Sequence, residues 1–183
     1  MDIISIYFIA LSLSSVFVFY LIKNKYRILF LTLLSCAFIA SFSLNLLVYV
    51  IAYSLVNYFI GLMMPGSEYK KCLFRTGLIL NLTQLIILKY ADFTLSPLFS
   101  LVNADPDFIL KISKIIIPVG ISFFTLQGIG YLINVKMGWE KPEQKLQDFI
   151  LYITFYPKYL SGPIERSNHF LPQLKVNKTF NEE

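Results

Sequence analysis

Phenol and amide side chains recur at helical spacing inside the long apolar runs of this sequence. Lipid offers such groups no hydrogen-bond partner, so each must face another helix or a polar cavity. Residues three or four apart share one face of a helix, so each set forms a polar stripe. The stripes are Tyr49, Tyr53, Asn57 and Gly61; Asn81 and Gln84; and Gly120, Gln127, Tyr131 and Asn134, with Gly128 and Gly130 allowing close backbone approach. A hydrogen bond to a neighbouring helix is enough to explain any one of these polar side chains. Three stripes in a short chain, however, favour a polar interior between the helices.

Residues that enzymes use for acid–base or metal chemistry are scarce. The chain has one histidine, His169, so it offers neither a histidine pair for a metal nor an evident serine–histidine–acid set. Cys36 and Cys72 lie in different apolar segments without metal-ligand spacing, and the glycines are too scattered for a phosphate-binding loop. We therefore expect no metal site and no bound cofactor.

The composition indicates an integral membrane protein. Of 183 residues, 56% are hydrophobic and 15% are charged, against about 25% charged in a typical soluble domain. A soluble fold of this size could not bury so much apolar surface. The net charge of +5 is therefore interpreted as marking cytoplasmic loops, and we expect no nucleic-acid partner.

Apolar segments predict an all-α protein with about five transmembrane helices. The apolar run from 28 to 64 would be nearly twice as long as the ~30 Å hydrocarbon core if it formed one helix, so the polar cluster at 41–45 is expected to reverse it. Pro65-Gly66-Ser67 ends the next crossing. The predicted crossings are 3–22, a short one at 28–42, 46–64, 72–90 and 118–135.

Two further segments do not read as crossings. Residues 91–107 contain three aspartates and two prolines, and we expect a loop with a small interfacial helix there. Residues 149–160 are apolar but too short to cross, and they contain Pro157. We predict a re-entrant helical segment, for which irregular backbone must be buried in protein or line a wet cavity. A cytoplasmic interfacial helix is the alternative, and 175–183 is expected to be a polar tail.

Basic residues predict the orientation. Three lie at 23–27 and three at 70–75, whereas 91–110 contains three aspartates and no lysine or arginine before Lys111. Because cytoplasmic loops carry an excess of lysine and arginine, this distribution predicts a multi-pass protein of the cell membrane with its N-terminus outside.

Residues 117–174 carry motifs that are specific enough to indicate a family. They are Pro118–Thr125, Gln127, Tyr131, Asp148-Phe149, Phe155-Tyr156-Pro157, Gly162-Pro163-Ile164, Arg166 and Phe170–Leu174, preceded upstream by Asn57–Gly61 and Lys89–Phe93. In this order they resemble the membrane-bound O-acyltransferase family. Within it, the sequence is similar to the bacterial branch of alginate O-acetylases and the D-alanyl transfer protein of teichoic acid.

The resemblance implies an activity and also an incomplete site. Family members take an acyl group, here expected to be acetyl, from a cytoplasmic thioester of coenzyme A or of an acyl carrier protein. They transfer it to a hydroxyl of a cell-envelope polysaccharide or related polymer, near a histidine that acts as the base. That histidine lies in a later span of the family, and His169 falls in a variable step of the motif. The resemblance therefore implies that 1–174 is the N-terminal part of the acyltransferase domain, an incomplete helical bundle without a catalytic residue and inactive alone.

The resemblance also suggests substrate-channel candidates. Gln127 and Tyr131 would line the cavity. Glu165 and Arg166 would form an ion pair at the base of the re-entrant segment, holding its geometry or meeting negative groups of the donor. Lys158 lies in an apolar stretch, where an unpaired ammonium is unfavourable, so it should reach the cytoplasmic interface or join that site.

Other interpretations stay open. The chain could be a truncated, non-catalytic membrane scaffold or subunit whose partners, besides the lipid bilayer, are a missing C-terminal half or other acylation subunits. A transporter or channel would also have polar helix faces, but we find no internal repeat between 1–90 and 91–183 of the kind that transporters contain.

Overall fold

The computed structural model describes residues 6–89, 120–159 and 165–176, and within these ranges all regular secondary structure is helical. Side chains are described from Phe8 onward. The helices are α1 (Ile6–Leu21), α2 (Asn24–Ala40), α3 (Leu44–Met63), α4 (Lys70–Lys89), α7 (Ile121–Met137), α8 (Leu146–Thr154), α9 (Tyr156–Tyr159) and α10 (Ser167–Lys175). The all-α prediction is confirmed for these residues.

The predicted chain reversal near residue 41 is confirmed. The Ser41 amide donates to the Ala37 carbonyl at 3.0 Å, which completes the last turn of α2. The backbone of Ser43 is then extended, with φ −168° and ψ 135°, and α3 begins at the next residue. A helix cannot continue through extended backbone, so the polar stretch separates two apolar helices.

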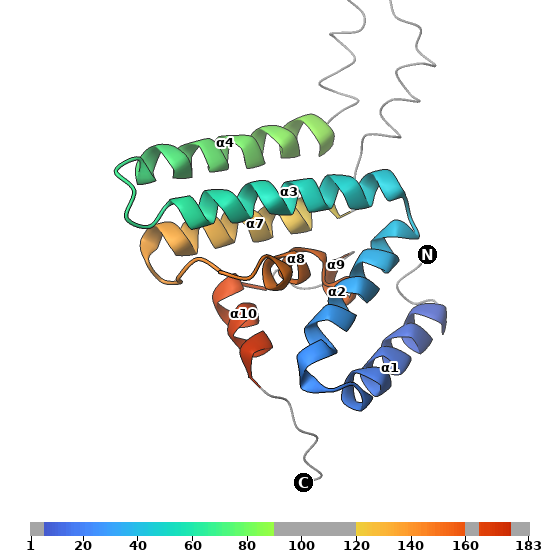
Figure 1. Ribbon diagram of the computed structural model, residues 1–183. Helices are drawn as coiled ribbons and strands as arrows, with labels where there is room; N and C mark the ends of the chain where they lie inside the picture. The colour runs from blue at the N-terminus through green and yellow to red at the C-terminus, as the bar shows by residue number, and fades with distance from the viewer. Residues whose placement is uncertain (1–5, 90–119, 160–164, 177–183) are drawn as a thin grey trace, which may run out of the picture.

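The helices form two parts that meet at α8 (Figure 1). In one part, α3, α4 and α7 lie side by side along almost the same direction. In the other, the α1–α2 hairpin runs obliquely to them. The short helices α8, α9 and α10 pack against α2 and α7, so they occupy the space between the two parts.

Two glycines allow close helix packing in the first part. A Cβ at Gly128 would lie 2.0 Å from the Tyr53 hydroxyl, and one at Gly61 would lie 2.5 Å from the Tyr131 ring. Both glycines are thus required by the side chain opposite them. Close backbone approach was also predicted at Gly130. This prediction is wrong among the described residues, because none of their atoms is found within 4 Å of the Gly130 Cβ position.

The segment predicted to be re-entrant is two helices rather than one. α8 starts at Leu146, earlier than expected, and the backbone of Phe155 (φ −48°, ψ 108°) interrupts it before α9. Phe149 and Leu151–Thr154 are all buried, and α8 packs against α2, α3 and α7. This burial favours a segment inside the bundle over an interfacial helix.

Within the described residues, two helices, α3 and α4, are long and apolar enough to cross a membrane. α1, α2 and α7 are shorter, with 16, 17 and 17 residues, so five crossings are not established. The predicted loop at 91–107 and the start of the 118–135 segment lie outside the described residues.

Candidate functional site

The polar stripes of α3 and α4 meet in what we term the amide network, which Thr125 of α7 joins. Its members are Tyr49, Tyr53, Asn57, Asn81, Gln84 and Thr125. The Tyr53 hydroxyl donates to Oδ1 of Asn81, whose amide nitrogen donates to Oδ1 of Asn57 at 2.8 Å. The Asn57 amide in turn donates to the Tyr53 carbonyl at 3.1 Å. These bonds join α3 to α4 in a closed set.

A second set of bonds joins α4 to α7. The Tyr49 hydroxyl donates to Oε1 of Gln84 at 2.7 Å, and the Gln84 amide donates to the Thr125 hydroxyl at 3.1 Å. A groove of about 300 Å³ lies between α3 and α4 over this network. The predicted stripes of α3 and α4 therefore do face each other, and their groups bond to each other.

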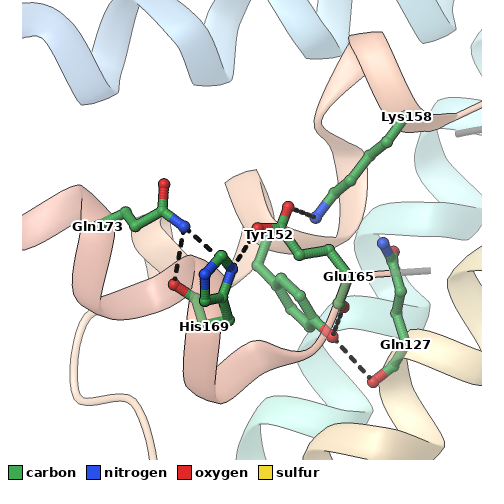
Figure 2. A network of polar contacts seen from close by, with 6 residues as sticks. All are labelled: Gln127, Tyr152, Lys158, Glu165, His169 and Gln173. Carbon is green, nitrogen blue, oxygen red and sulfur yellow. Dashed lines mark hydrogen bonds and ion pairs between the residues drawn. The ribbon is translucent and has the colours of Figure 1, made fainter. Parts of the chain in front are cut away.

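A second polar region, which we term the Lys158 cluster, consists of Tyr152, Lys158, Glu165, His169 and Gln173 (Figure 2). It is positioned by α9, which is anchored to the α1–α2 hairpin. The Tyr156 hydroxyl lies 2.6 Å from the Ser15 hydroxyl, and the Tyr156 amide donates to the Ser35 hydroxyl at 3.2 Å. These bonds hold the neighbouring Lys158 against α8 and α10.

Lys158 is buried, with 6% of its surface exposed. Its Nζ lies 3.8 Å from the centre of the Phe170 ring, 4.5 Å from that of Tyr152 and 4.0 Å from Oε2 of Glu165. Its ammonium makes no hydrogen bond to any described residue. Burial lowers the pKa of Lys158 to about 8, although the Glu165 carboxylate opposes that shift. Lys158 therefore lies beside Glu165, and its role in a substrate channel stays a prediction.

Glu165 links the buried lysine to the surface. Its Oε1 lies 3.0 Å from Nδ1 of His169, and the Gln173 amide lies 3.1 Å from that same nitrogen. The Tyr152 hydroxyl bridges the carbonyls of Glu165 and Gln127 at 3.1 and 3.3 Å (Figure 2). The cluster thus runs from α7 to an exposed histidine on α10.

The predicted ion pair between Glu165 and Arg166 is wrong. Glu165 pairs with Lys158 and His169 instead, while Arg166 is exposed. Arg166 has extended backbone and precedes the first residue of α10. Side chains of adjacent extended residues point apart, whereas α9 and the first turn of α10 bring Lys158 and His169 to the carboxylate.

A cleft of about 590 Å³ lies beside the Lys158 cluster, between the α1–α2 hairpin and α9–α10. Glu165 and Gln173 line it, as do the rings of Phe155 and Phe170. Its other wall comes from the second half of α1 and the first half of α2, including Val16, Leu31 and the basic residue Arg27. We call it the α1–α10 cleft.

Gln127 and Tyr131 are buried but do not line this cleft. The Tyr131 ring packs 4.6 Å from the Phe149 ring, and its hydroxyl accepts the Glu143 amide at 3.2 Å. Tyr131 therefore holds the loop that precedes α8 against α7. The role of both residues in a substrate channel stays a prediction.

One polar cluster was not predicted. Oε2 of Glu140 accepts hydrogen bonds from the Ser167 hydroxyl at 2.5 Å and from the Asn134 amide at 3.4 Å. Burial raises the pKa of Glu140, and the hydrogen bonds from Ser167 and Asn134 partly offset this rise. The stripe on α7 identified Asn134 as inward-facing, but no sequence pattern pointed to Glu140 or Ser167. The cluster secures α10 to α7.

The described residues contain no group of three or more acidic, histidine or cysteine side chains that could hold a metal ion. The Lys158 cluster is the better candidate, because it combines ionisable groups with an adjoining cleft.

Comparison with curated proteins identifies relatives of the chain. It is 27% identical to the probable alginate O-acetylase AlgI of Pseudomonas aeruginosa, with 85% of this chain and 31% of that protein aligned. It is 30% identical to the corresponding protein of Pseudomonas putida, over 88% of the chain and 34% of the relative. The chain is a homologue of bacterial O-acetylases.

A further relative extends the match beyond alginate. The peptidoglycan O-acetyltransferase of Helicobacter pylori is 28% identical over 80% of this chain and 32% of its own length. The resemblance predicted from the motifs is thus confirmed. The chain spans about a third of the length of the curated relatives it matches. No family model and no solved structure matches it.

Proposed function

We propose that the chain forms part of a membrane-embedded O-acetyltransferase that transfers an acetyl group to a hydroxyl of a cell-envelope polysaccharide or related polymer. The observation that carries this proposal is homology across 80–88% of the chain to proteins named alginate O-acetylase and peptidoglycan O-acetyltransferase. The homologues differ in acceptor, so the proposal specifies acetyl transfer and leaves the polymer open.

We place the protein in the cell membrane, as a multi-pass protein with its N-terminus outside. Two observations support this placement. Helices α3 and α4 are apolar and long enough to cross a membrane, and only 11% of the apolar stretch of α4 is buried within the fold. A core helix of a soluble protein would be mostly buried, so lipid is the natural solvent for this helix. The basic residues at 23–27 and 70–75 support the orientation.

The proposed donor is a cytoplasmic thioester, of coenzyme A or of an acyl carrier protein. In this proposal Gln127, Tyr131, Lys158, Glu165 and Arg166 line the route of donor or acceptor. Acetyl transfer needs a base within hydrogen-bond reach of the attacking hydroxyl and exclusion of water from the thioester. We assign that base to none of the described residues, because the resemblance places the family's histidine in a later span and His169 in a variable step of the motif.

A two-polypeptide replacement tests this proposal. In a Pseudomonas aeruginosa strain lacking its alginate O-acetylase, this chain is expressed together with the part of that enzyme to which it does not align. The control strain carries the enzyme's own aligned segment as a separate polypeptide. We expect acetyl esters on alginate in both strains, measured by alkaline release of acetate.

Acetylation in the control strain and none with this chain, when both segments are found in the membrane, would contradict the proposal and favour a non-catalytic scaffold or subunit. The chain alone, reconstituted in lipid vesicles with acetyl coenzyme A and an oligosaccharide acceptor, should give no acetylated product. Turnover there would show that the base lies among the 183 residues.

A further inference from the structure

The ammonium of Lys158 is buried but not hydrogen-bonded. Buried polar groups nearly always have a hydrogen-bond partner, and an ammonium has three donors. The faces of Phe170 and Tyr152, 3.8 and 4.5 Å away, supply some cation–π attraction. They accept no strong hydrogen bond, so the three donors remain available to an acceptor that reaches them.

The carboxylate nearest to Lys158 is held more closely by another group. Glu165 lies 3.0 Å from His169 but 4.0 Å from Lys158. It also lies two residues before Ser167, where the amino end of α10 favours negative charge. Glu165 is 29% exposed, so its side chain has room to turn towards α10. Moving it would cost Lys158 only a long contact.

The α1–α10 cleft lies directly behind this arrangement. Three of its lining residues, Phe155, Phe170 and Glu165, are the same ones that surround the Lys158 ammonium. The facing wall combines apolar residues, Val16 and Leu31 among them, with the basic residue Arg27. Lys158 itself does not line the cleft. A ligand there would meet apolar side chains along its length, and it would reach the Lys158 ammonium where Glu165 turns aside.

We propose that the α1–α10 cleft binds a short organic anion whose carboxylate reaches the Lys158 ammonium in place of Glu165, while its alkyl part packs against α1 and α2. The ligand supplies the acceptor that Lys158 lacks, and His169 keeps Glu165 paired. The inference concerns binding alone and does not depend on the proposed acetyl transfer.

Calorimetric titration of the full chain in neutral-lipid nanodiscs tests this site. The probes are butyrate, 1-butanol and butylammonium, which share an alkyl chain and differ in charge, and empty nanodiscs give the background. We expect saturable binding of butyrate at pH 7 and none of butylammonium. Lys158→Met should weaken butyrate binding by about tenfold or more, as expected for a lost charged hydrogen bond. Lys145→Met, which alters an exposed lysine, should leave it unchanged.

A second variant keeps the test decisive if Lys158→Met fails to fold. Val16 lines the cleft and is 56% exposed, so Val16→Trp should fill the cleft without touching Lys158. It should abolish butyrate binding, whereas Val48→Trp, at an exposed site on α3, should not. Binding of 1-butanol as tight as that of butyrate, or butyrate binding unaffected by Lys158→Met or by Val16→Trp, would overturn the proposal.

Discussion

The amide network and the Lys158 cluster both have buried polar groups between helices, yet they differ in how those groups are paired. In the network, neutral side chains from α3, α4 and α7 bond to one another. The buried side-chain atoms left without a partner in the described part of the chain are those of Asp148, Lys158 and Tyr159, and none belongs to the network. A network with every group paired stabilises helix packing, whereas the buried Lys158 ammonium has a 4.0 Å ion pair with Glu165 and no hydrogen bond.

The largest loss of stability is expected from adding a methyl group at Gly128, where the amide network leaves no space. Gly128→Ala would place a methyl group 2.0 Å from the Tyr53 hydroxyl and force that tyrosine away from Asn81. We expect a loss of about 3 kcal/mol of stability, since overpacking and a broken buried bond add. Thermal unfolding in detergent measures it. Gly130→Ala on the same helix has open space and should be neutral or slightly stabilising.

The Lys158 cluster should make the stability of the fold depend on pH, unlike the amide groups of the amide network. The pKa of Lys158 is lowered from 10.5 to about 8, so between these values the unfolded chain binds more protons than the folded chain. Stability should therefore rise with pH from about 8 upward, by up to roughly 3 kcal/mol at the end of the window.

Lys158→Met tests that assignment. Replacing a buried charge by an apolar side chain of similar length should raise stability by about 2 kcal/mol at pH 7 and remove the rise above pH 8. Denaturation at several pH values up to about 9.5 avoids most tyrosine ionisation. An unchanged pH profile in Lys158→Met would mean that the ammonium is well solvated in the folded protein.

A smaller effect is expected from opening one bond of the amide network. Asn81→Leu removes the acceptor of Tyr53 and the donor to Asn57. We expect a loss of about 1 kcal/mol, because polar bonds between membrane helices are individually modest. Thr83→Leu, at an exposed position of α4, is the matched control. Equal stability of the two variants would show that the network contributes nothing to packing.

Sequence patterns located α3, α4, the turn at residue 41 and the inward faces of three helices. Each of these features follows from residues that are close in the sequence. The length of an apolar run, the polar stretch that interrupts it and the spacing of polar side chains can all be read locally. The partners on those faces were not predictable. The Thr125 side chain of α7 joins the network. The Gln127 carbonyl instead accepts from Tyr152 of α8, and the Asn134 amide donates to Ser167 of α10. A helix face is wide enough to touch two neighbours, and only packing decides which residue meets which.

The same distinction holds at the candidate site. The sequence named Lys158 and Glu165 but joined Glu165 to Arg166, its neighbour in the chain, and set His169 aside. The break at Phe155 and the amino end of α10 bring residues 158, 165 and 169 together. Composition and spacing thus determined that this chain is helical, apolar and polar-striped. The tertiary structure alone decided which charge is buried without a hydrogen bond, because desolvation depends on every element that surrounds a group.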